Sequence, residues 1–345
     1  MIPMRTPSTS SPPASSPPAS PLATSARPVS PLRAARLPLM LLALLAALLL
    51  IPLSGEIYYV KFATRMAIYG LIALGLDLVV GYVGLISLGH AAFVGIGAYA
   101  TGILAAHGVD LALVVWPAAM LAAGAAALAI GALSLRTGGI HFILLTLAFA
   151  QMIYYLAQSL RAYGGDDGFA LALPTRLAGG LDGGDPVVFF YAVVALLLLV
   201  LFLAKRLVDS RFGQVIQGSR DNERRLSAIG IAPFPHKLVA FTVSGAVCGL
   251  GGALLANLTG YITPNLLGWA LSGELLMMVI LGSVGTLVGP VLGGALFIVF
   301  EQLLSDRTDH WMLIFGVILV VRVLALRDGI YGLLRNGLQP TGERP

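Results

Sequence analysis

Long apolar runs alternate with short polar segments along most of this 345-residue chain. Because about 20 consecutive apolar residues of a helix cross about 30 Å of hydrocarbon, these runs predict about ten membrane-spanning helices. Gly and Pro breaks place the predicted spans at 38–54, 64–82, 85–106, 111–134, 139–160, 187–204, 237–257, 273–288, 290–305 and 310–327. The pattern therefore predicts an all-α, polytopic helical membrane protein.

Gly and Pro residues also interrupt the pattern in two regions, 83–90 and 258–272. Both regions are equally compatible with loops and with re-entrant or broken helices. Other glycines recur at helical spacing inside the apolar runs, as in Gly245 with Gly249. In lipid, small residues let helix backbones approach each other closely, so these glycines predict a tightly packed bundle.

The charged residues test the predicted topology, because Lys and Arg concentrate in the cytoplasmic loops of membrane proteins. With the N-terminus inside, the cytoplasmic segments carry Arg136, Lys205, Arg206, Arg211, Arg220, Arg224, Arg225, Lys237, Arg327 and Arg335. The opposite loops carry Asp110, Asp166, Asp167, Asp182, Asp185, Asp306 and Asp309. Ten spans with both termini in the cytoplasm satisfy the rule.

The same pattern divides the chain into three parts. Residues 1–37 contain nine Pro, eight Ser and no acidic residue, which predicts a disordered cytoplasmic leader. The apolar run that follows is interpreted as the first span rather than a signal peptide, because the leader is long and no small-residue cleavage site follows. Residues 38–335 form the predicted transmembrane domain, with a cytoplasmic loop at 206–236, and residues 336–345 form a cytoplasmic tail.

Composition excludes the soluble classes. Hydrophobic residues make up 58% of the chain and charged residues 11%, whereas soluble domains contain about 25% charged residues. The net charge of +5 would suggest nucleic acid in a soluble protein, but the cations lie at span ends as topology signals, so no nucleic-acid partner is expected. The single cysteine, Cys248, excludes an internal disulfide and is interpreted as a packing residue.

No catalytic motif is found in the sequence. It lacks a G-x-x-x-x-G-K-[ST] phosphate loop, an H-E-x-x-H zinc motif and a G-x-S-x-G nucleophile elbow. Asp166 and Asp167 lie among glycines and are interpreted as a turn rather than an acid/base pair. The chain is therefore predicted not to be an enzyme by itself and to hold no metal or cofactor of its own.

Polar residues inside the spans are candidates for a solute path, because an ionisable group at the bilayer centre costs about 2.5–3.5 kcal/mol. Four lie deep or beside glycine breaks and are the candidate translocation-pathway residues: Ser87, His90, Thr146 and Gln151. Four others lie near span ends and are interpreted as satisfied interfacial residues: Asp77, His141, Glu274 and Glu301.

The most informative polar segment is Arg211–Ile231, RFGQVIQGSRDNERRLSAIGI. Ser219 or Asp221 is expected to cap a helix start, and Gly230 with the prolines after it is expected to end the helix. The resulting helix of about ten residues would be marginal alone in water, so it is expected to pack on another surface. From the residues alone, docking on a cytoplasmic partner and lying on anionic headgroups of membrane lipid are equally supported.

Several motifs, in a fixed order, carry a family resemblance. They are GLDLVVGYVGLISLGHAAFVGIGAYA, GGIHFILLTLAFAQ, GGDDGF, SRFGQVIQGSRDNERRLSAIGI, KLVAFTVSGAVCGLGGALLANLTGYITP and GELLMMVILGSVGTLVGPVLGGAL. From about residue 66 to 334, the chain resembles the LivM-like permeases of ABC importers for branched-chain amino acids. The segment from 210 to 231 is similar to the loop through which these permeases couple to their ATPases.

The resemblance implies roles for residues of this loop. The implied ATPase-coupling residues are Arg220, Asp221, Asn222, Glu223, Arg224, Ala228 and Gly230. The chain departs from the family at Arg224, Arg225 and Leu226, where small residues are common, and at His141, where Tyr is common. The first departure bears on the fit to the ATPase and the second on solute preference.

The resemblance also implies a function: the permease subunit of an ATP-driven importer for branched-chain amino acids or a related small polar solute, working by alternating access. It implies a location in the bacterial inner membrane. The implied partners are a LivH-like second permease, two cytoplasmic ABC ATPase subunits that hold ATP and Mg, and a periplasmic solute-binding protein. The residues leave open a stand-alone secondary transporter driven by ions through Asp77 or His90, and they do not identify the solute.

Overall fold

The computed structural model describes residues 50, 52, 55–173, 175–177, 184–308 and 310–325, with side chains up to residue 320. The predicted leader at 1–37, nearly all of the first predicted span at 38–54 and the tail at 336–345 lie outside the described residues. So do Asp182, Asp309, Arg327 and Arg335. The predictions that rest on them, including the side of the membrane on which each terminus lies, stay predictions.

Helices form most of the described structure. In chain order they are α3 (Ile57–Asp77), the π-helix η2 (Leu78–Val83), α4 (His90–Ala106), α5 (Ala112–Ser134), α6 (Ile140–Ser159), the short 3₁₀ helix η3 (Arg161–Tyr163), α7 (Pro186–Val208), α8 (Arg211–Ala228), α9 (Pro233–Thr259), the 3₁₀ helix η4 (Pro264–Leu267), α10 (Trp269–Gly282), α11 (Val288–Ser305) and α12 (Trp311–Ala325). Two short strands that the sequence did not predict, β1 (Phe169–Ala170) and β2 (Tyr261–Ile262), pair antiparallel.

Six helical segments in the described part of the chain are long and apolar enough to cross a membrane. They are Ile57–Val83, Ala112–Ser134, Ile140–Ser159, Pro186–Val208, Pro233–Thr259 and Val288–Ser305. Three shorter apolar helices, α4, α10 and α12, overlap the predicted spans at 85–106, 273–288 and 310–327. The prediction of a polytopic helical protein is confirmed, whereas the total of ten spans stays a prediction.

Two non-helical segments shorten α4 and α10. Gly84, with φ +79°, ends η2, and helix does not resume until the buried His90. The chain turns again after α10, where Ser283 has φ +123° and Gly285 has φ +77°. The region 83–90 is therefore a helix break within the fold, and the region 258–272 contains β2 and η4 instead of one continuous helix.

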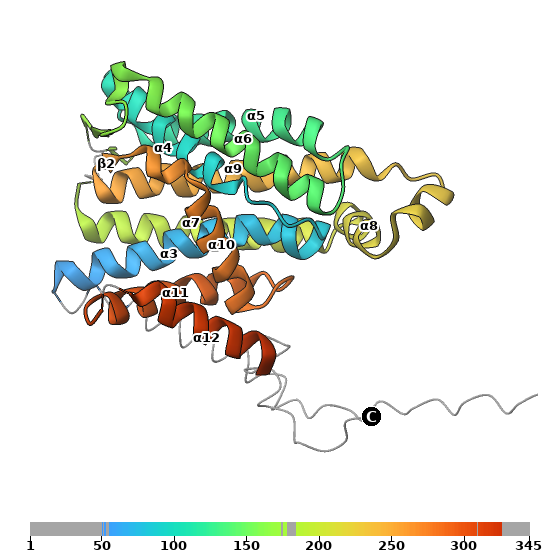
Figure 1. Cartoon of the computed structure of the whole chain (residues 1–345). Helices are drawn as coiled ribbons and strands as arrows, with labels where there is room; N and C mark the ends of the chain where they lie inside the picture. Colours follow the sequence, from blue (N-terminus) through green and yellow to red (C-terminus); the bar gives the residue numbers. More distant parts are fainter. Residues whose placement is uncertain are drawn as a thin grey trace, which may run out of the picture.

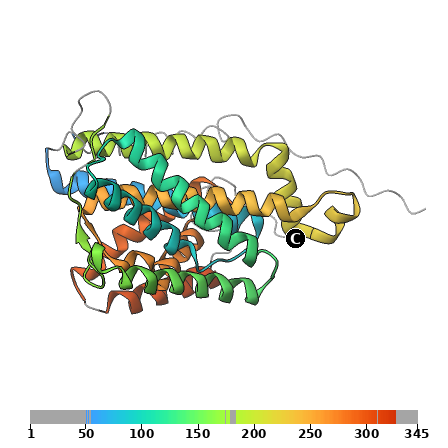
Figure 2. The same ribbon diagram turned by 90° about the horizontal axis from the view of Figure 1, so that it is seen from above.

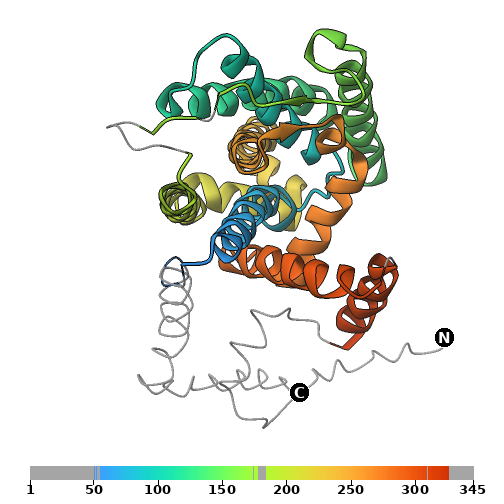
Figure 3. The same ribbon diagram turned by 90° about the vertical axis from the view of Figure 1, so that its left-hand side faces the viewer.

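The centre of the bundle is α9, which is seen end-on in Figure 3 with α4 and α5 on one side and α3 on the other. Glycines make this packing close: a Cβ at Gly97 of α4 would overlap the carbonyl group of Gly249 of α9. Both helices therefore contact each other through bare backbone, as the glycine spacing predicted. Helix α3 packs against α9 and also against α7 and α11.

The two ends of the bundle differ in structure and in charge. Figure 1 shows the long helices side by side, with α8 at one end and β2 at the other, and Figure 2 shows α8 and the start of α9 extending past the other helices. The α8 end carries Lys205, Arg206, Arg211, Arg220, Arg224 and Arg225 beside Asp209, Asp221 and Glu223, and the β2 end carries Asp110, Asp166, Asp167, Asp185 and Asp306 beside Arg161, Arg176 and Arg307. By the positive-inside rule, the α8 end is expected to face the cytoplasm.

Candidate functional site

Helix α8 starts earlier than the sequence predicted. It runs from Arg211 for 18 residues, and its N-cap is Ser210, whose Oγ accepts from the Gly213 N–H at 3.3 Å. Neither Ser219 nor Asp221 caps it. The prediction of a start near 219 was wrong because Phe212 and Ile216, one helical turn apart, pack with Val83 and Ala240 of the membrane domain and extend the helix toward α7.

The helix changes direction at Asn222, which has non-helical φ −160° and ψ 98°. Its Oδ1 accepts from the Arg225 N–H at 3.0 Å, so Asn222 caps the second half of the helix. At the other end, Gly230 has φ +85°, its N–H bonds to the Ser227 carbonyl, and the Ile231 N–H bonds to the Leu226 carbonyl. This is a Schellman motif, and it confirms the predicted stop at Gly230.

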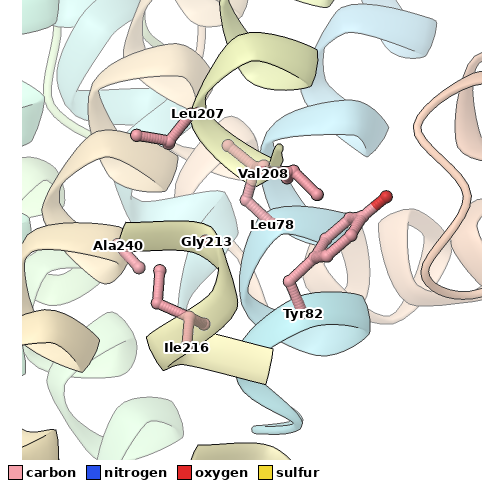
Figure 4. Close-up of a pocket in the computed structure, with 7 residues that line it drawn as sticks. All are labelled: Leu78, Tyr82, Leu207, Val208, Gly213, Ile216 and Ala240. Carbon is pink, nitrogen blue, oxygen red and sulfur yellow. The ribbon is translucent and has the colours of Figure 1, made fainter. Parts of the chain in front are cut away.

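The first half of α8 is fixed to the membrane domain. A small pocket with apolar walls lies where α8 meets α7, α9 and the end of α3 (Figure 4), lined by Leu78, Tyr82, Leu207, Val208, Gly213, Ile216 and Ala240. Gly213 lies so near the Val208 carbonyl group that a Cβ would overlap it. Because the walls offer a polar solute so little to bind, this pocket belongs to the packing of α8 and not to a solute path.

The second half projects into solvent, and we call residues Asn222–Gly230 the coupling tip. Most of its side chains are exposed, including Arg224, Arg225 and Ala228. Ile229 is 68% exposed at the end of the tip, an apolar residue outside any membrane-spanning helix. The tip therefore offers an exposed apolar residue beside basic ones, a combination suited to a protein surface.

Two of the implied coupling residues are bound by this chain itself. The Glu223 carboxylate accepts from the Lys237 ammonium at 2.8 Å, and the side chain of Lys237 is only 11% exposed. The Arg220 guanidinium donates to the carbonyl of Gly81 in η2, and its aliphatic part lies over Gly84. The sequence did not predict Lys237, Gly81 or Gly84 as partners. Glu223 and Lys237 are 14 positions apart, and Arg220 and Gly81 are 139 positions apart, so no local pattern connects them.

Two of the four candidate pathway residues contact each other at the helix break, and a third lies against the same segment. His90 is completely buried, with Nδ1 3.0 Å from Ser87 Oγ and Nε2 2.9 Å from Ser244 Oγ. Gly89 packs against the backbone of Thr146, whose Oγ1 donates to the Ile143 carbonyl at 2.9 Å. The structure thus joins Ser87 and His90 in one buried hydrogen-bonded network, with the buried Thr146 packed against the neighbouring Gly89, and their role in translocation stays a prediction.

Donor directions follow from the rest of this network. Ser244 Oγ donates to the Gly75 carbonyl at 2.5 Å, so it accepts from His90 Nε2–H. His90 Nδ1 then accepts from Ser87 O–H, and Ser87 Oγ accepts from the Gly89 N–H at 3.2 Å. With this assignment, a neutral His90 has both of its ring nitrogens satisfied.

The fourth candidate, Gln151, lies apart from this cluster. It is five positions beyond Thr146 on α6 and so on a different side of the helix. Its Nε2 is buried and has no hydrogen-bond partner among the described residues.

The four residues interpreted as interfacial differ from one another. The Glu301 carboxylate accepts from the Arg65 guanidinium at 2.8 and 3.0 Å. Glu274 interacts electrostatically with Glu301 and Arg65. His141 is exposed. Asp77 is instead 0% exposed: η2 and the α10–α11 loop cover it, and its Oδ1 accepts from the Gly285 N–H at 2.8 Å. The described residues contain no group of three or more His, Cys, Asp or Glu that could hold a metal ion.

Comparisons with known proteins give consistent results. The model of the family described as branched-chain amino acid transport system / permease component matches residues 58–323. LivM of Salmonella typhimurium strain LT2 and LivM of Escherichia coli strain K12 are each 31% identical over 328 residues, which cover 87% of this chain and 76% of theirs. LivH of Salmonella typhimurium strain LT2 is 25% identical over 284 residues, covering 76% of this chain and 91% of its own. No solved structure matches.

Proposed function

The chain belongs to the family of branched-chain amino acid transport system permease components, and from this premise we propose that it is the membrane subunit of an ATP-driven importer. The resemblance to LivM-like permeases is confirmed. The observation that carries the proposal is the coupling tip, a capped helical turn that projects from the α8 end and exposes Arg224, Arg225 and Ile229. Such a tip gives a partner on that side of the membrane a surface to bind.

In the proposed assembly, two cytoplasmic ABC ATPase subunits bind the tip, and a LivH-like second permease completes the pore. The relatives named LivM and LivH are both permease proteins of high-affinity branched-chain amino acid transport systems, and this chain is similar to both, which supports a pair of related permeases. ATP and Mg are held by the ATPase subunits. The solute is a branched-chain amino acid or a related small polar molecule.

The proposed mechanism is alternating access. Because α8 is packed on η2, α7 and α9, a displacement of the tip by the ATPases is passed to three membrane helices at once. Rigid-body rocking of helix groups then opens the solute path to one side and closes it to the other. Our proposal assigns Ser87, His90, Thr146 and Gln151 to that path.

The opposite end of the bundle is the proposed docking face for a periplasmic solute-binding protein. Here β1 and β2 pair, and the Tyr261 hydroxyl donates to the Asp167 carbonyl at 2.7 Å. These contacts hold the 160–170 segment against the end of α9. Asp166 and Asp167 are exposed on this face, beside the exposed Arg161.

Charge reversal in the tip tests the proposal. Glu223→Lys places a second cation against Lys237, breaks the ion pair and should displace the tip from its geometry. We expect the subunit to insert normally and ATP-driven uptake into vesicles to fall at least tenfold, the effect of about 1.4 kcal/mol in the coupling step. Asp209→Lys, also exposed at the α8 end but outside the tip, is the matched control and should transport normally.

Two results would contradict the proposal. Normal uptake by the Glu223→Lys importer would remove the coupling role from the tip. Uptake by the purified single chain under a proton or sodium gradient, without ATP, would instead support a stand-alone secondary transporter.

A further inference from the structure

The end of α3 is unusual where it meets α8. Helix α3 ends at Asp77 and continues as the π-helix η2, and π-helical turns occur frequently at functional sites. The Gly81 carbonyl in this turn accepts from the Arg220 guanidinium, just before the coupling tip. One side chain therefore connects α8 directly to the end of a long membrane helix.

Asp77 lies beside this connection and is only half satisfied. Its Oδ1 accepts from the Gly285 N–H, but its Oδ2 is buried and has no hydrogen-bond partner among the described residues. The Arg220 guanidinium lies beside Gly285, the residue that binds Asp77, since a Cβ on Gly285 would be 3.6 Å from Arg220 Nη1. A buried carboxylate oxygen without a partner is costly, so an arrangement that supplies a donor would be favoured.

Gly285, which donates its N–H to Asp77, belongs to the α10–α11 loop. This loop contains Ser283 with φ +123°, and Ser283 is the one non-glycine residue with positive φ in the described part of the chain. Such rare conformations persist only where the surroundings enforce them, and they cluster at switch regions. Gly81 touches both sides of the junction, since a Cβ there would overlap Asp77 Oδ1 and Gly285.

We propose that Asp77 is a positioning residue that transmits movement of α8 to the α10–α11 loop, with Arg220 exchanging the Gly81 carbonyl for the free Asp77 oxygen as the tip moves. This inference rests on the proposed function, because the ATPases must move the tip. The two acceptors provide two discrete arrangements of one guanidinium. In the second, the acceptor is a carboxylate as well, so the bond joins two opposite charges and is stronger than the bond to a neutral carbonyl, and it pulls on the carboxylate that holds Gly285.

The first step of the test compares two replacements of Arg220. Lys keeps the charge, and Gln keeps a neutral donor that can bond to the Gly81 carbonyl. If the charge acts on Asp77, the Arg220→Lys importer should retain most of the solute transported per ATP hydrolysed, and Arg220→Gln should lose about tenfold. Equal ratios for both variants would show that the carbonyl bond alone matters and would overturn the inference.

The second step is a double-mutant cycle with Asp77→Asn, which keeps the Oδ1 acceptor for Gly285. We expect Asp77→Asn and Arg220→Gln each to lower the transport-to-ATP ratio about tenfold, and the double variant to be no worse than the poorer single one. Losses that multiply, to about a hundredfold, would mean that the two residues act independently and would overturn the inference. The matched pair Asp209→Asn and Arg136→Gln, exposed at the same end, should leave the ratio unchanged.

Copurification with the ATPases and thermal unfolding of each variant separate positioning from folding. The inference expects assembled complexes of normal stability that hydrolyse ATP with little transport. Loss of assembly together with transport would assign Asp77 and Arg220 a purely structural role and overturn it. Failure of the wild-type importer to show ATP-driven uptake would be a distinct result, contradicting the proposed function itself.

Discussion

Serine hydroxyls satisfy the buried polar groups that the helix break at 84–89 creates. The first N–H groups of a helix lack intrahelical partners, and water is absent from the bilayer core, so a buried helix start needs side-chain acceptors. Ser87 Oγ accepts from the Gly89 N–H, and Ser272 Oγ accepts from the Ala91 N–H at 3.0 Å. His90 then links Ser87 to Ser244 and so connects α4 to α9.

Removal of one hydroxyl from this network should destabilise the protein. Ser244→Ala leaves the His90 Nε2–H without an acceptor in a fully buried site, which costs about 1–3 kcal/mol. We expect a lower thermal unfolding temperature in detergent. Ser159→Ala, at an exposed site where Oγ bonds only to the Leu156 carbonyl one turn earlier, is the control and should unfold near the wild-type temperature.

Helix α8 shows how one element can have two different roles. Its first half buries Gly213, Ile216 and Ser219 against the membrane domain, and its second half, beyond Asn222, is exposed. The kink between the halves sends the coupling tip away from the direction of the first half, and Gly230 ends it with a left-handed residue. The geometry of the tip is therefore set by its two caps and by the Glu223–Lys237 ion pair.

The Gly230 cap can be tested by a single methyl group. Gly230→Ala meets no neighbour within 4 Å, so its cost comes from the left-handed backbone and should be about 1–2 kcal/mol. We expect faster hydrogen exchange in the tip and weaker ATP-driven uptake with the rest of the protein unchanged. Gly138→Ala has equally open surroundings without a positive φ, and should change neither measurement.

At the scale of the whole molecule, the bundle depends on close contacts between α9 and its neighbours. The α4–α9 contact is made through the backbones of Gly97 and Gly249, whereas Gly124 of α5 faces α9 at ordinary van der Waals distance. Since apolar burial gives little driving force between helices in lipid, such backbone contacts and the buried hydroxyls hold α9 at the centre.

Adding a methyl group at these two contacts should have opposite outcomes. Gly97→Ala overlaps the Gly249 carbonyl group and should cost about 1–3 kcal/mol as the helices separate. Gly124→Ala, whose Cβ would lie 3.5 Å from the Ala246 Cβ, should be tolerated. Thermal unfolding of both variants checks the pair, and equal unfolding temperatures would refute backbone packing as the reason for the glycine at 97.

The sequence by itself determined the helical membrane class, the approximate places of most helices between 64 and 325 and the stop of α8 at Gly230. These features depend on apolar length and local backbone preference, which a chain carries in its own neighbouring residues. The family could be predicted as well, because the motifs at 75–100 and 210–231 resemble those of LivM-like permeases, and comparison with known proteins confirms the family.

Only the tertiary structure decided which of these residues meet. The early start of α8, the breaks that shorten α4 and α10, the Glu223–Lys237 pair and the junction of Asp77 with Arg220 and Gly285 all depend on contacts between distant parts of the chain. No local pattern encodes which acceptor a buried donor will find, because that choice is made by the packing of whole helices.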